Sequence, residues 1–222
     1  MNAPTASPAC RVFVADDHAL VRDGLVALLH REPGFEVCGT AADGETALGL
    51  IRQHSPAVAL LDHGMPRLGG IALVQRLRAE GNAARLLLLS SFSSPLLIAD
   101  ALNTGADGFL LKDDAFADLR DALRTAMRGE LALSRSVDRD ALRDAVNSVP
   151  PTPRERAVLA GLVAGRSLPQ IGALLGISPR TAETYRNRLA AKFGARNVVD
   201  LVRRAVAAGY AGETDPTINP AP

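Results

Sequence analysis

The hydrophobic pattern divides the chain into two parts. Through residue 128, short apolar runs alternate with longer segments whose apolar residues recur every three or four positions. The short runs are typical of buried strands, and the longer spacing is typical of amphipathic helices. The expected strands are residues 11–15, 35–39, 58–61, 86–90 and 108–111. The expected helices are residues 19–30, 44–53, 68–80, 95–104 and 115–128.

Strict alternation of strands and helices predicts a parallel sheet with helices on both faces. Five such strands suit the α/β flavodoxin-like fold, whose strand order 2-1-3-4-5 places the ends of the first and third strands side by side. Asp16 and Asp17 follow the first strand. Asp62 follows the third strand, and Lys112 follows the fifth. We therefore expect three carboxylates and one ammonium group to meet at the carboxyl edge of the sheet.

Carboxylates that share a pocket repel each other, and a divalent cation relieves the repulsion. Mg2+ fits because it binds oxygen atoms, takes few carboxylates and keeps several waters. We expect Asp17 and Asp62 to be direct ligands, together with the backbone carbonyl of Gly64, and Asp16 to act through a water. The Asp62 carboxylate can then act as a nucleophile toward a phosphoryl group that Mg2+ and Lys112 stabilise. The alternative is an acidic cluster that only solvates the sheet edge.

Beyond Pro150 and Pro151 the strand-like runs disappear and only helical spacing remains. Residues 152–155, Thr-Pro-Arg-Glu, have the pattern of a capping box with proline at the first helical position. Residues 176–178, Gly-Ile-Ser, are typical of the turn in a helix-turn-helix. The expected helices start after Thr152 and after Ser167, and then occupy residues 179–193 and 197–208.

The two parts also differ in charge. Residues 1–128 contain 12 basic and 15 acidic side chains, whereas residues 150–222 contain 10 basic and 5 acidic ones. A basic second part permits a nucleic-acid partner. The outer face of the helix at 179–193 carries side chains of the kind that contact phosphates and bases in a major groove; a solvated helix in a small bundle is the alternative. The expected DNA contacts are Arg180, Thr181, Glu183, Thr184, Arg186, Asn187, Arg188 and Lys192.

Several motifs of the first part occur at spacings that are specific in combination. They are Asp16-Asp17-His18, Asp62 with Met65-Pro66, Ser90, and Gly105-Ala-Asp-Gly-Phe109-Leu-Leu-Lys112. Over residues 10–128 the sequence thereby resembles the receiver domain of bacterial response regulators. The resemblance implies that a sensor histidine kinase phosphorylates Asp62, that Ser90 hydrogen-bonds the phosphoryl group, and that Phe109 rotates inward. His63 is expected to point away from the acceptor, into solvent or the neighbouring helix.

The second part carries Thr152-Pro-Arg-Glu, Leu175-Gly-Ile-Ser-Pro-Arg-Thr181 and Lys192-Phe-Gly. Over residues 151–210 it looks like the LuxR-type DNA-binding domain, so the whole chain is similar to the NarL/FixJ class of response regulators. Glu183 departs from the lysine that is frequent there; it repels a phosphate but can accept a hydrogen bond from a cytosine amino group. The resemblance implies a transcription regulator that binds double-stranded DNA as a homodimer when phosphorylated. The implied dimer contacts are Val199, Val202 and Val206. Packing of these side chains in the core of the helix bundle would explain their apolar character equally well.

We expect a disordered lead at residues 1–9, a linker at 129–150 with a helical piece near 136–146, and a disordered tail at 211–222. No apolar run approaches the roughly 20 residues that span a bilayer, and no secretory signal is present. A cytoplasmic protein without membrane contact and without enzymatic turnover is therefore expected. Two alternatives remain open. One is phosphorylation-independent DNA binding with a silent receiver. The other is a Mg2+-dependent phosphohydrolase with an aspartyl nucleophile, although Gly64 stands where such an enzyme usually has its general acid.

Overall fold

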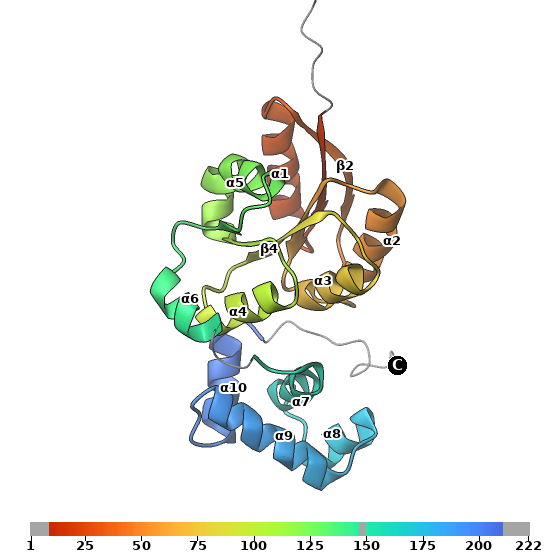
Figure 1. The fold of residues 1–222 in the computed structure, drawn as a ribbon. Helices are drawn as coiled ribbons and strands as arrows, with labels where there is room; N and C mark the ends of the chain where they lie inside the picture. Colours follow the sequence, from red (N-terminus) through yellow and green to blue (C-terminus); the bar gives the residue numbers. More distant parts are fainter. Residues whose placement is uncertain (1–8, 147–149, 211–222) are drawn as a thin grey trace, which may run out of the picture.

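The computed structural model describes residues 9–146 and 150–210, which form two domains (Figure 1). The expectations for residues 1–8, 147–149 and 211–222, which include most of the lead and the whole tail, lie outside the described residues. Among the described residues, no helix is both long enough and apolar enough to cross a membrane.

The N-terminal domain is a parallel sheet in the order β2-β1-β3-β4-β5-β6, with helices on both faces. The expected order 2-1-3-4-5 is therefore confirmed. The strands are β1 (Cys10–Ala15), β2 (Phe35–Ala41), β3 (Val58–Asp62), β4 (Arg85–Ser90), β5 (Gly108–Leu111) and β6 (Ala132–Leu133). The helices are α1 (Ala19–Arg31), α2 (Gly44–His54), α3 (Gly70–Ala79), α4 (Pro95–Asn103) and α5 (Lys112–Met127).

Alternation along each buried strand divides the core between the two faces of the sheet. On β1, Val12 and Val14 belong to the core that includes α1 and α5. Phe13 and Ala15 belong to the core that includes α2, α3 and α4. Successive strand side chains point to opposite faces, and helices cover both, so the central strands are apolar at nearly every position. This explains why β3 reads as an unbroken apolar run up to Asp62.

The sixth strand was not expected, because the sequence predicts only a linker there. Residues of β6 pair in parallel with β5, with Gly108 opposite Ala132 and Phe109 opposite Leu133. A Cβ on Gly108 would lie 2.4 Å from the carbonyl oxygen of Ala132, so only glycine allows this approach. The helix α6 (Arg139–Val146) follows and packs against α4, close to the helical piece expected near residues 136–146.

The C-terminal domain consists of α7 (Pro153–Val163), α8 (Leu168–Leu175), α9 (Pro179–Lys192) and α10 (Val198–Ala207). The capping box is formed: the Thr152 side chain accepts from the amide of Glu155, and the Glu155 carboxylate accepts from the amide of Thr152. Gly176, with φ of 64°, ends α8 in the left-handed conformation that glycine adopts readily. These local signals set the helix ends, and the apolar faces then assemble the helix-turn-helix.

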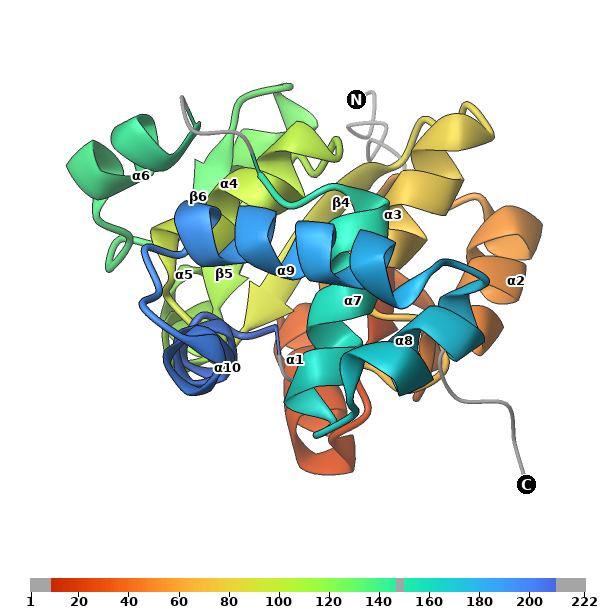
Figure 2. The ribbon, with the colours of Figure 1, turned by 90° about the horizontal axis from the view of Figure 1, so that it is seen from below.

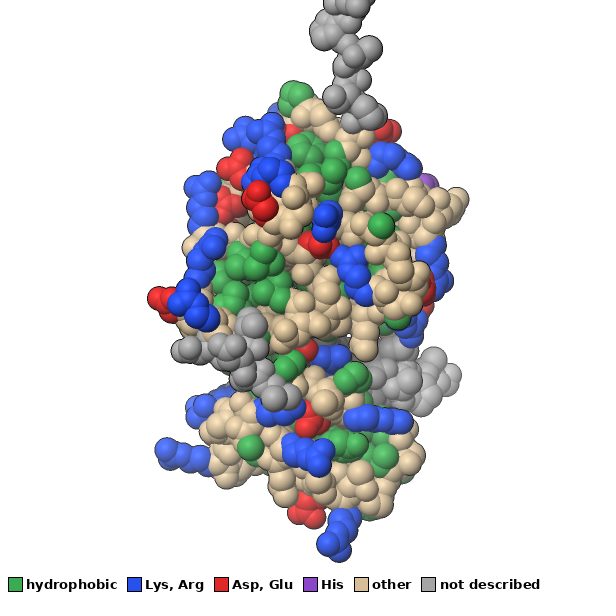
Figure 3. Space-filling view, in the orientation of Figure 1, with side chains coloured by type: hydrophobic (Ala, Val, Ile, Leu, Met, Phe, Trp, Pro, Cys, Tyr) green, Lys and Arg blue, Asp and Glu red, His purple; other side chains and the backbone are tan. Residues whose placement is uncertain are grey.

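The helix α9 lies on the side of its domain that is remote from the sheet (Figure 1). Seen from below, α9 crosses in front of α7, with the N-terminal domain behind them (Figure 2). Lys and Arg side chains are spread over the C-terminal domain in Figure 3, with few acidic side chains among them. The outer face of α9 therefore faces away from the N-terminal domain.

Candidate functional site

The acidic pocket lies at the carboxyl edge of the sheet, where β1 and β3 are neighbours. Asp62 is the last residue of β3, and Asp16 follows β1 directly. The pairing of Ala15 with Leu61 brings the two carboxylates together. Asp16 is fully buried and Asp62 is 3% exposed. Strand order alone thus produces a buried pair of acids, as the sequence predicts.

Lys112 completes this pocket from the far side of β4. It is the first residue of α5, directly after β5, and its long side chain reaches across to β1 and β3. Its Nζ lies 2.9 Å from Asp16 Oδ2 and 3.0 Å from Asp62 Oδ1. One ammonium group is therefore shared between two buried carboxylates.

The electrostatics of the pocket favour additional positive charge. Burial raises the pKa of Asp62, and the negative charge of Asp16 raises this pKa further. The charge and hydrogen bond of Lys112 and a backbone hydrogen bond from Gly64 lower it only in part. For Lys112, burial lowers the pKa, but its hydrogen bonds and charge interactions with Asp16 and Asp62 outweigh burial, so the net shift is upward. The lysine is thus held charged while the Asp62 carboxylate remains under-compensated.

The residues around the pocket fit a hard divalent cation. Ligand atoms of Asp16, Asp17, His18 and Asp62 all lie within 4.8 Å of one another. Asp16 Oδ2 is buried, and its close polar contact is Lys112 Nζ at 2.9 Å. Carboxylate oxygens with room for water are the donors that Mg2+ prefers. His18 is exposed, and its Nδ1 lies 2.6 Å from Asp17 Oδ1.

Ser90 and Phe109 lie beside the pocket on the next two strands. Ser90 ends β4 and is 1% exposed, and its Oγ accepts a hydrogen bond of 3.0 Å from the amide of Phe92. Phe109 on β5 is fully buried in the core on the α4 side of the sheet. The hydroxyl thus holds the loop that begins after β4, and the aromatic ring occupies an inner position.

The sequence predicts that His63 points into solvent or toward the neighbouring helix. The structure shows that it does not face solvent. It is 2% exposed, and its Nε2 lies 2.7 Å from the carbonyl oxygen of Gly209, in the C-terminal domain. Sequence reasoning missed this contact, because no local pattern tells which surfaces of two domains meet.

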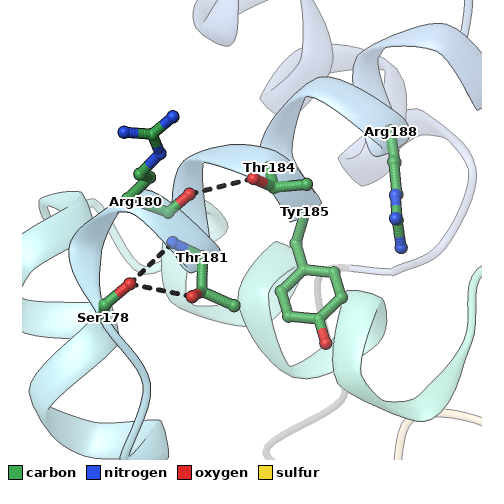
Figure 4. A pocket seen from close by; sticks show the side chains of 6 residues that line it. All are labelled: Ser178, Arg180, Thr181, Thr184, Tyr185 and Arg188. Carbon is green, nitrogen blue, oxygen red and sulfur yellow. Dashed lines mark hydrogen bonds between the residues drawn. The ribbon is translucent and has the colours of Figure 1, made fainter.

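The outer face of α9 is accessible along most of its length. Arg180, Glu183, Thr184, Asn187 and Arg188 are exposed, and Thr181 is half-buried. The helix start is fixed by Ser178, whose Oγ accepts from the amide of Thr181 at 3.0 Å. Figure 4 shows Tyr185 and Arg188 pointing to one side of α9, whereas Arg180 points to the other. The Arg188 guanidinium lies 5.9 Å from the centre of the Tyr185 ring, a distance typical of a cation–π contact.

Several of the expected DNA contacts are engaged within the domain. Arg186 Nη2 lies 3.1 Å from Glu183 Oε1 and 2.8 Å from Asn187 Oδ1. Lys192 Nζ lies 2.5 Å from Glu155 Oε2 and 2.8 Å from the carbonyl oxygen of Pro150. Lys192 therefore ties the end of α9 to the start of α7.

The three valines expected at a dimer contact differ in exposure along α10. Val199 is 75% exposed and Val206 is 39% exposed, whereas Val202 is half-buried and packs against the core. A row of apolar side chains at this spacing lies on one face of a helix. This face is available to a partner at its first and last positions.

Comparison with known proteins identifies both domains. A family model for the response regulator receiver domain matches residues 12–124. A second model, for bacterial regulatory proteins of the luxR family, matches residues 151–205. The transcriptional regulatory protein MctR of Rhizobium johnstonii is 40% identical over 205 residues, which cover 91% of this chain and 95% of MctR. The transcriptional regulatory protein UhpA of Escherichia coli is 36% identical over 194 residues, which cover 87% of this chain and 96% of UhpA.

Solved structures agree with these relatives. The receiver domain of the response regulator NarL from Mycobacterium tuberculosis has 39% identity and a TM-score of 0.54, covering 56% of this chain and all of that one. RcsB of Salmonella enterica bound to a promoter has 23% identity and a TM-score of 0.70, covering 88% of this chain and 98% of that one, and supports the fold alone. The fold and the two sites define a two-domain regulator, with an α/β input domain and a helix-turn-helix output domain. The chain belongs to the response regulators of two-component systems that carry a LuxR-type DNA-binding domain.

Proposed function

We propose that Asp62 accepts a phosphoryl group from the phosphohistidine of a sensor histidine kinase. The observation that carries this proposal is the position of Lys112 Nζ, 3.0 Å from Asp62 Oδ1 and 2.9 Å from Asp16 Oδ2. A carboxylate oxygen of Asp62 attacks phosphorus, the bond from phosphorus to the histidine nitrogen breaks, and an acyl phosphate results. The ammonium group of Lys112 stabilises the negative charge on the transferred group.

Mg2+ bound beside Asp62 would neutralise charge on the phosphoryl oxygens. Asp17 and Asp62 would hold it directly, with the backbone carbonyl of Gly64 as a further ligand, and Asp16 would act through a water. The raised pKa of Asp62, caused first by burial and then by Asp16, supports a demand for added positive charge at this place.

The switch would use Ser90 and Phe109. The Ser90 hydroxyl, now accepting from the amide of Phe92, would turn to hydrogen-bond a phosphoryl oxygen on Asp62. The loop after β4 would move inward over Phe109, which already occupies the inner position that the expected rotation would give it. A two-state element of this kind can be biased by one new charged group.

The DNA interface would be the outer face of α9. Its arginines would contact phosphates or guanines, and Glu183 would accept from a cytosine amino group. Arg186, tethered to Glu183 and Asn187, would orient these two side chains and contact the backbone. Thr181 and Thr184 would contact the flanking phosphates. We leave Lys192 out of this set, because its ammonium group is already paired with Glu155.

Phosphorylated chains would pair through α10, and the pair would bind two half-sites of a DNA duplex. The protein would act in the cytoplasm. Val199, Val202 and Val206 lie on the pairing face, and the exposure of Val199 leaves apolar surface for a partner. Paired recognition helices bind half-sites that are separated by about one helical turn of DNA.

The acceptor is tested with acetyl phosphate and Mg2+, followed by intact-mass measurement. Wild type is expected to gain one phosphoryl group and Asp62→Asn none, whereas Asp113→Asn, which changes an acid in the first turn of α5, should behave as wild type. Gain of mass in Asp62→Asn would place the acceptor elsewhere. Continued release of phosphate from a phosphomonoester would instead favour the phosphohydrolase.

The DNA interface is tested on a duplex obtained by selection from random sequence. Arg188→Ala should weaken binding to all sequences and reduce the salt slope by about 1 if Arg188 contacts a phosphate. Glu183→Gln should relax preference at one base pair while leaving the others unchanged. Affinity that is indifferent both to acetyl phosphate and to Asp62→Asn would favour the silent receiver.

A further inference from the structure

Three polar side chains on the outer face of α9 form a hydrogen-bonded cluster. Arg186 Nη2 donates to Glu183 Oε1 at 3.1 Å. Both Nη2 and Nε of Arg186 donate to Asn187 Oδ1, at 2.8 and 3.2 Å. Arg186 is the half-buried member, with 30% of its side chain exposed, whereas Glu183 and Asn187 are exposed. The arginine thus holds two polar side chains that remain accessible to a ligand.

The hydrogen bonds from Arg186 determine which end of the Asn187 amide can meet a base. A guanidinium group carries donors only, so the Asn187 atom that faces it must be the amide oxygen. An amide oxygen has two lone pairs, and two N–H groups of Arg186 occupy them. The NH2 group, which carries two donors, is then the end of Asn187 that can meet a base. In this arrangement Asn187 acts as a donor.

Glu183 has the opposite hydrogen-bonding polarity. A carboxylate only accepts hydrogen bonds, and Arg186 engages Oε1, so that Oε2 can accept from an amino group. The positive charge of Arg186 also offsets the negative charge of Glu183, which would otherwise be repelled by the phosphates of a duplex. An acidic residue can therefore stand on this face of α9 without opposing the approach of DNA as a whole.

Glu183 and Asn187 line one hollow on the surface of the domain. Residues at the start of α8 and along α9 form this hollow together. A second hollow on α9 is lined by Tyr185 and Arg188, which point to one side of the helix (Figure 4). One hollow thus presents a cation and an aromatic ring, whereas the other presents an acceptor and a donor suited to base edges.

The spacing of this acceptor and this donor matches neighbouring base pairs in a major groove. Residues four apart on a helix are separated by about 6 Å along its axis, and base pairs stack about 3.4 Å apart. Glu183 and Asn187 therefore reach bases within about two base-pair steps of each other. An accepting oxygen selects the amino group of cytosine. Two donors match the adjacent N7 and O6 acceptors of guanine, whereas adenine needs an acceptor beside the donor.

We propose that Arg186 is a positioning residue that makes Asn187 select guanine, close to a cytosine that Glu183 selects. The inference rests on the proposed role of α9 as the DNA interface. An asparagine whose oxygen is free binds adenine through N6 and N7 together. Because Arg186 occupies that oxygen, the N6 amino group of adenine finds no acceptor on Asn187, and guanine is favoured.

Selection of duplexes from random sequence by the full chain, with acetyl phosphate and Mg2+ present, tests the assignment. The base pairs read by Asn187 and Glu183 are those at which Asn187→Ala and Glu183→Gln lose their preference. At the Asn187 position the wild type is expected to favour guanine over adenine by roughly tenfold, as one good bidentate contact does. Arg186→Met removes the donors and keeps an unbranched stem, so the freed Asn187 oxygen should turn the preference toward adenine.

Arg188→Met is the matched control, because it removes a guanidinium group from the other hollow of α9, where Arg188 lies beside the Tyr185 ring. It should weaken binding to all sequences and leave the preference for guanine unchanged. Asn187→Asp is a second test that keeps Arg186 in place. Its side chain has no donor when ionised, so the preference for guanine should be lost. Far-UV circular dichroism verifies that each variant is folded.

The outcomes separate this inference from the proposed function. Failure of the wild type to enrich any sequence would refute sequence-specific binding through α9, and the inference with it. An enriched sequence in which Asn187→Ala changes no position, or in which its position is adenine in the wild type, would overturn the inference alone. A guanine preference that survives Arg186→Met or Asn187→Asp would likewise overturn it and leave the DNA interface standing.

Discussion

Lys112→Met removes the ammonium group from the acidic pocket while keeping an unbranched side chain of similar length. The two ion pairs that it breaks are 2.9 and 3.0 Å long and join a lysine side chain 12% exposed to carboxylates that are 0% and 4% exposed. Removing one partner of a buried ion pair destabilises by about 3–5 kcal/mol, because a buried charge is left uncompensated. We expect the free energy of unfolding to fall by about 3 kcal/mol at pH 7.5 without Mg2+.

Protonation of Asp62 limits this loss of stability. The direction in which stability changes with pH follows from the raised pKa of Asp62. Burial and the charge of Asp16 already raise that pKa in the wild type, and loss of Lys112 raises it further. The folded variant therefore binds a proton that the unfolded chain releases, between the ordinary aspartate pKa and the raised one. Stability is lost as pH rises through the folded pKa. On acidification from pH 7.5 the variant should recover about 1.4 kcal/mol per pH unit within this window.

Lys192→Met is the matched control, because the other lysine of the chain also pairs with a buried carboxylate, Glu155. Burial opposes ionisation of Glu155, but the hydrogen bonds from Lys192 and Thr152 outweigh burial and lower its pKa. The contribution of this pair is present above the ordinary glutamate pKa and is lost only as pH falls through the lowered one. Glu155 keeps its hydrogen bonds from Thr152 when Lys192 is removed, so the loss caused by Lys192→Met should depend less on pH than the loss caused by Lys112→Met.

Urea unfolding distinguishes the two lysines by domain as well as by pH. Both tyrosines lie in the DNA-binding domain, so tyrosine emission follows that domain, whereas far-UV circular dichroism follows both domains. Lys112→Met should shift the circular dichroism transition and recover with Mg2+ or with acid. A Lys112→Met loss that stays the same from pH 7.5 down to the ordinary aspartate pKa would refute the reasoning about the under-compensated Asp62 carboxylate.

Three further predictions concern single contacts. Thr152→Ala should lower the free energy of unfolding of the DNA-binding domain by about 1 kcal/mol, measured by tyrosine emission in urea, because the amide of Glu155 loses its acceptor. Gly70→Ala should abolish phosphorylation or folding of the receiver, since its Cβ would lie 2.5 Å from the carbonyl oxygen of Asp62; a phosphorylated, stable variant would contradict this. Gly49→Ala, with open space inside α2, should stabilise the receiver by about 0.5–1 kcal/mol, measured by far-UV circular dichroism in urea.

Most of the receiver fold could be predicted because its strands are buried on both sides and appear as apolar runs. The parallel order then follows from alternation with helices. The short strand β6 could not be predicted, since two residues carry no periodicity. Its pairing depends on Gly108 allowing close approach and on Ser134, whose amide donates to the Phe109 carbonyl and whose Oγ accepts from the Leu111 amide.

The acidic pocket could be predicted for the same reason as the sheet. Asp16, Asp62 and Lys112 each end or follow a strand, so strand order brings them together. The contact between His63 and Gly209 could not be predicted, because their separation in sequence is large and no repeated pattern links them. Gly209 also has a sufficient local explanation as the glycine that ends α10, and this conceals its role between domains.

The size of the interdomain contact is consistent with control by one phosphoryl group. Reversing a two-state equilibrium from 1:99 to 99:1 requires a differential interaction of about 5.5 kcal/mol. The contact comprises the Arg156–Asp100 pair, hydrogen bonds from His63 and Tyr210, and the packing around Gly209. Hydrogen bonds contribute about 1 kcal/mol each, and a buried ion pair contributes little net, since desolvation offsets attraction. A net contact free energy of about a few kcal/mol follows, which is smaller than the roughly 5.5 kcal/mol that fully reverses such an equilibrium.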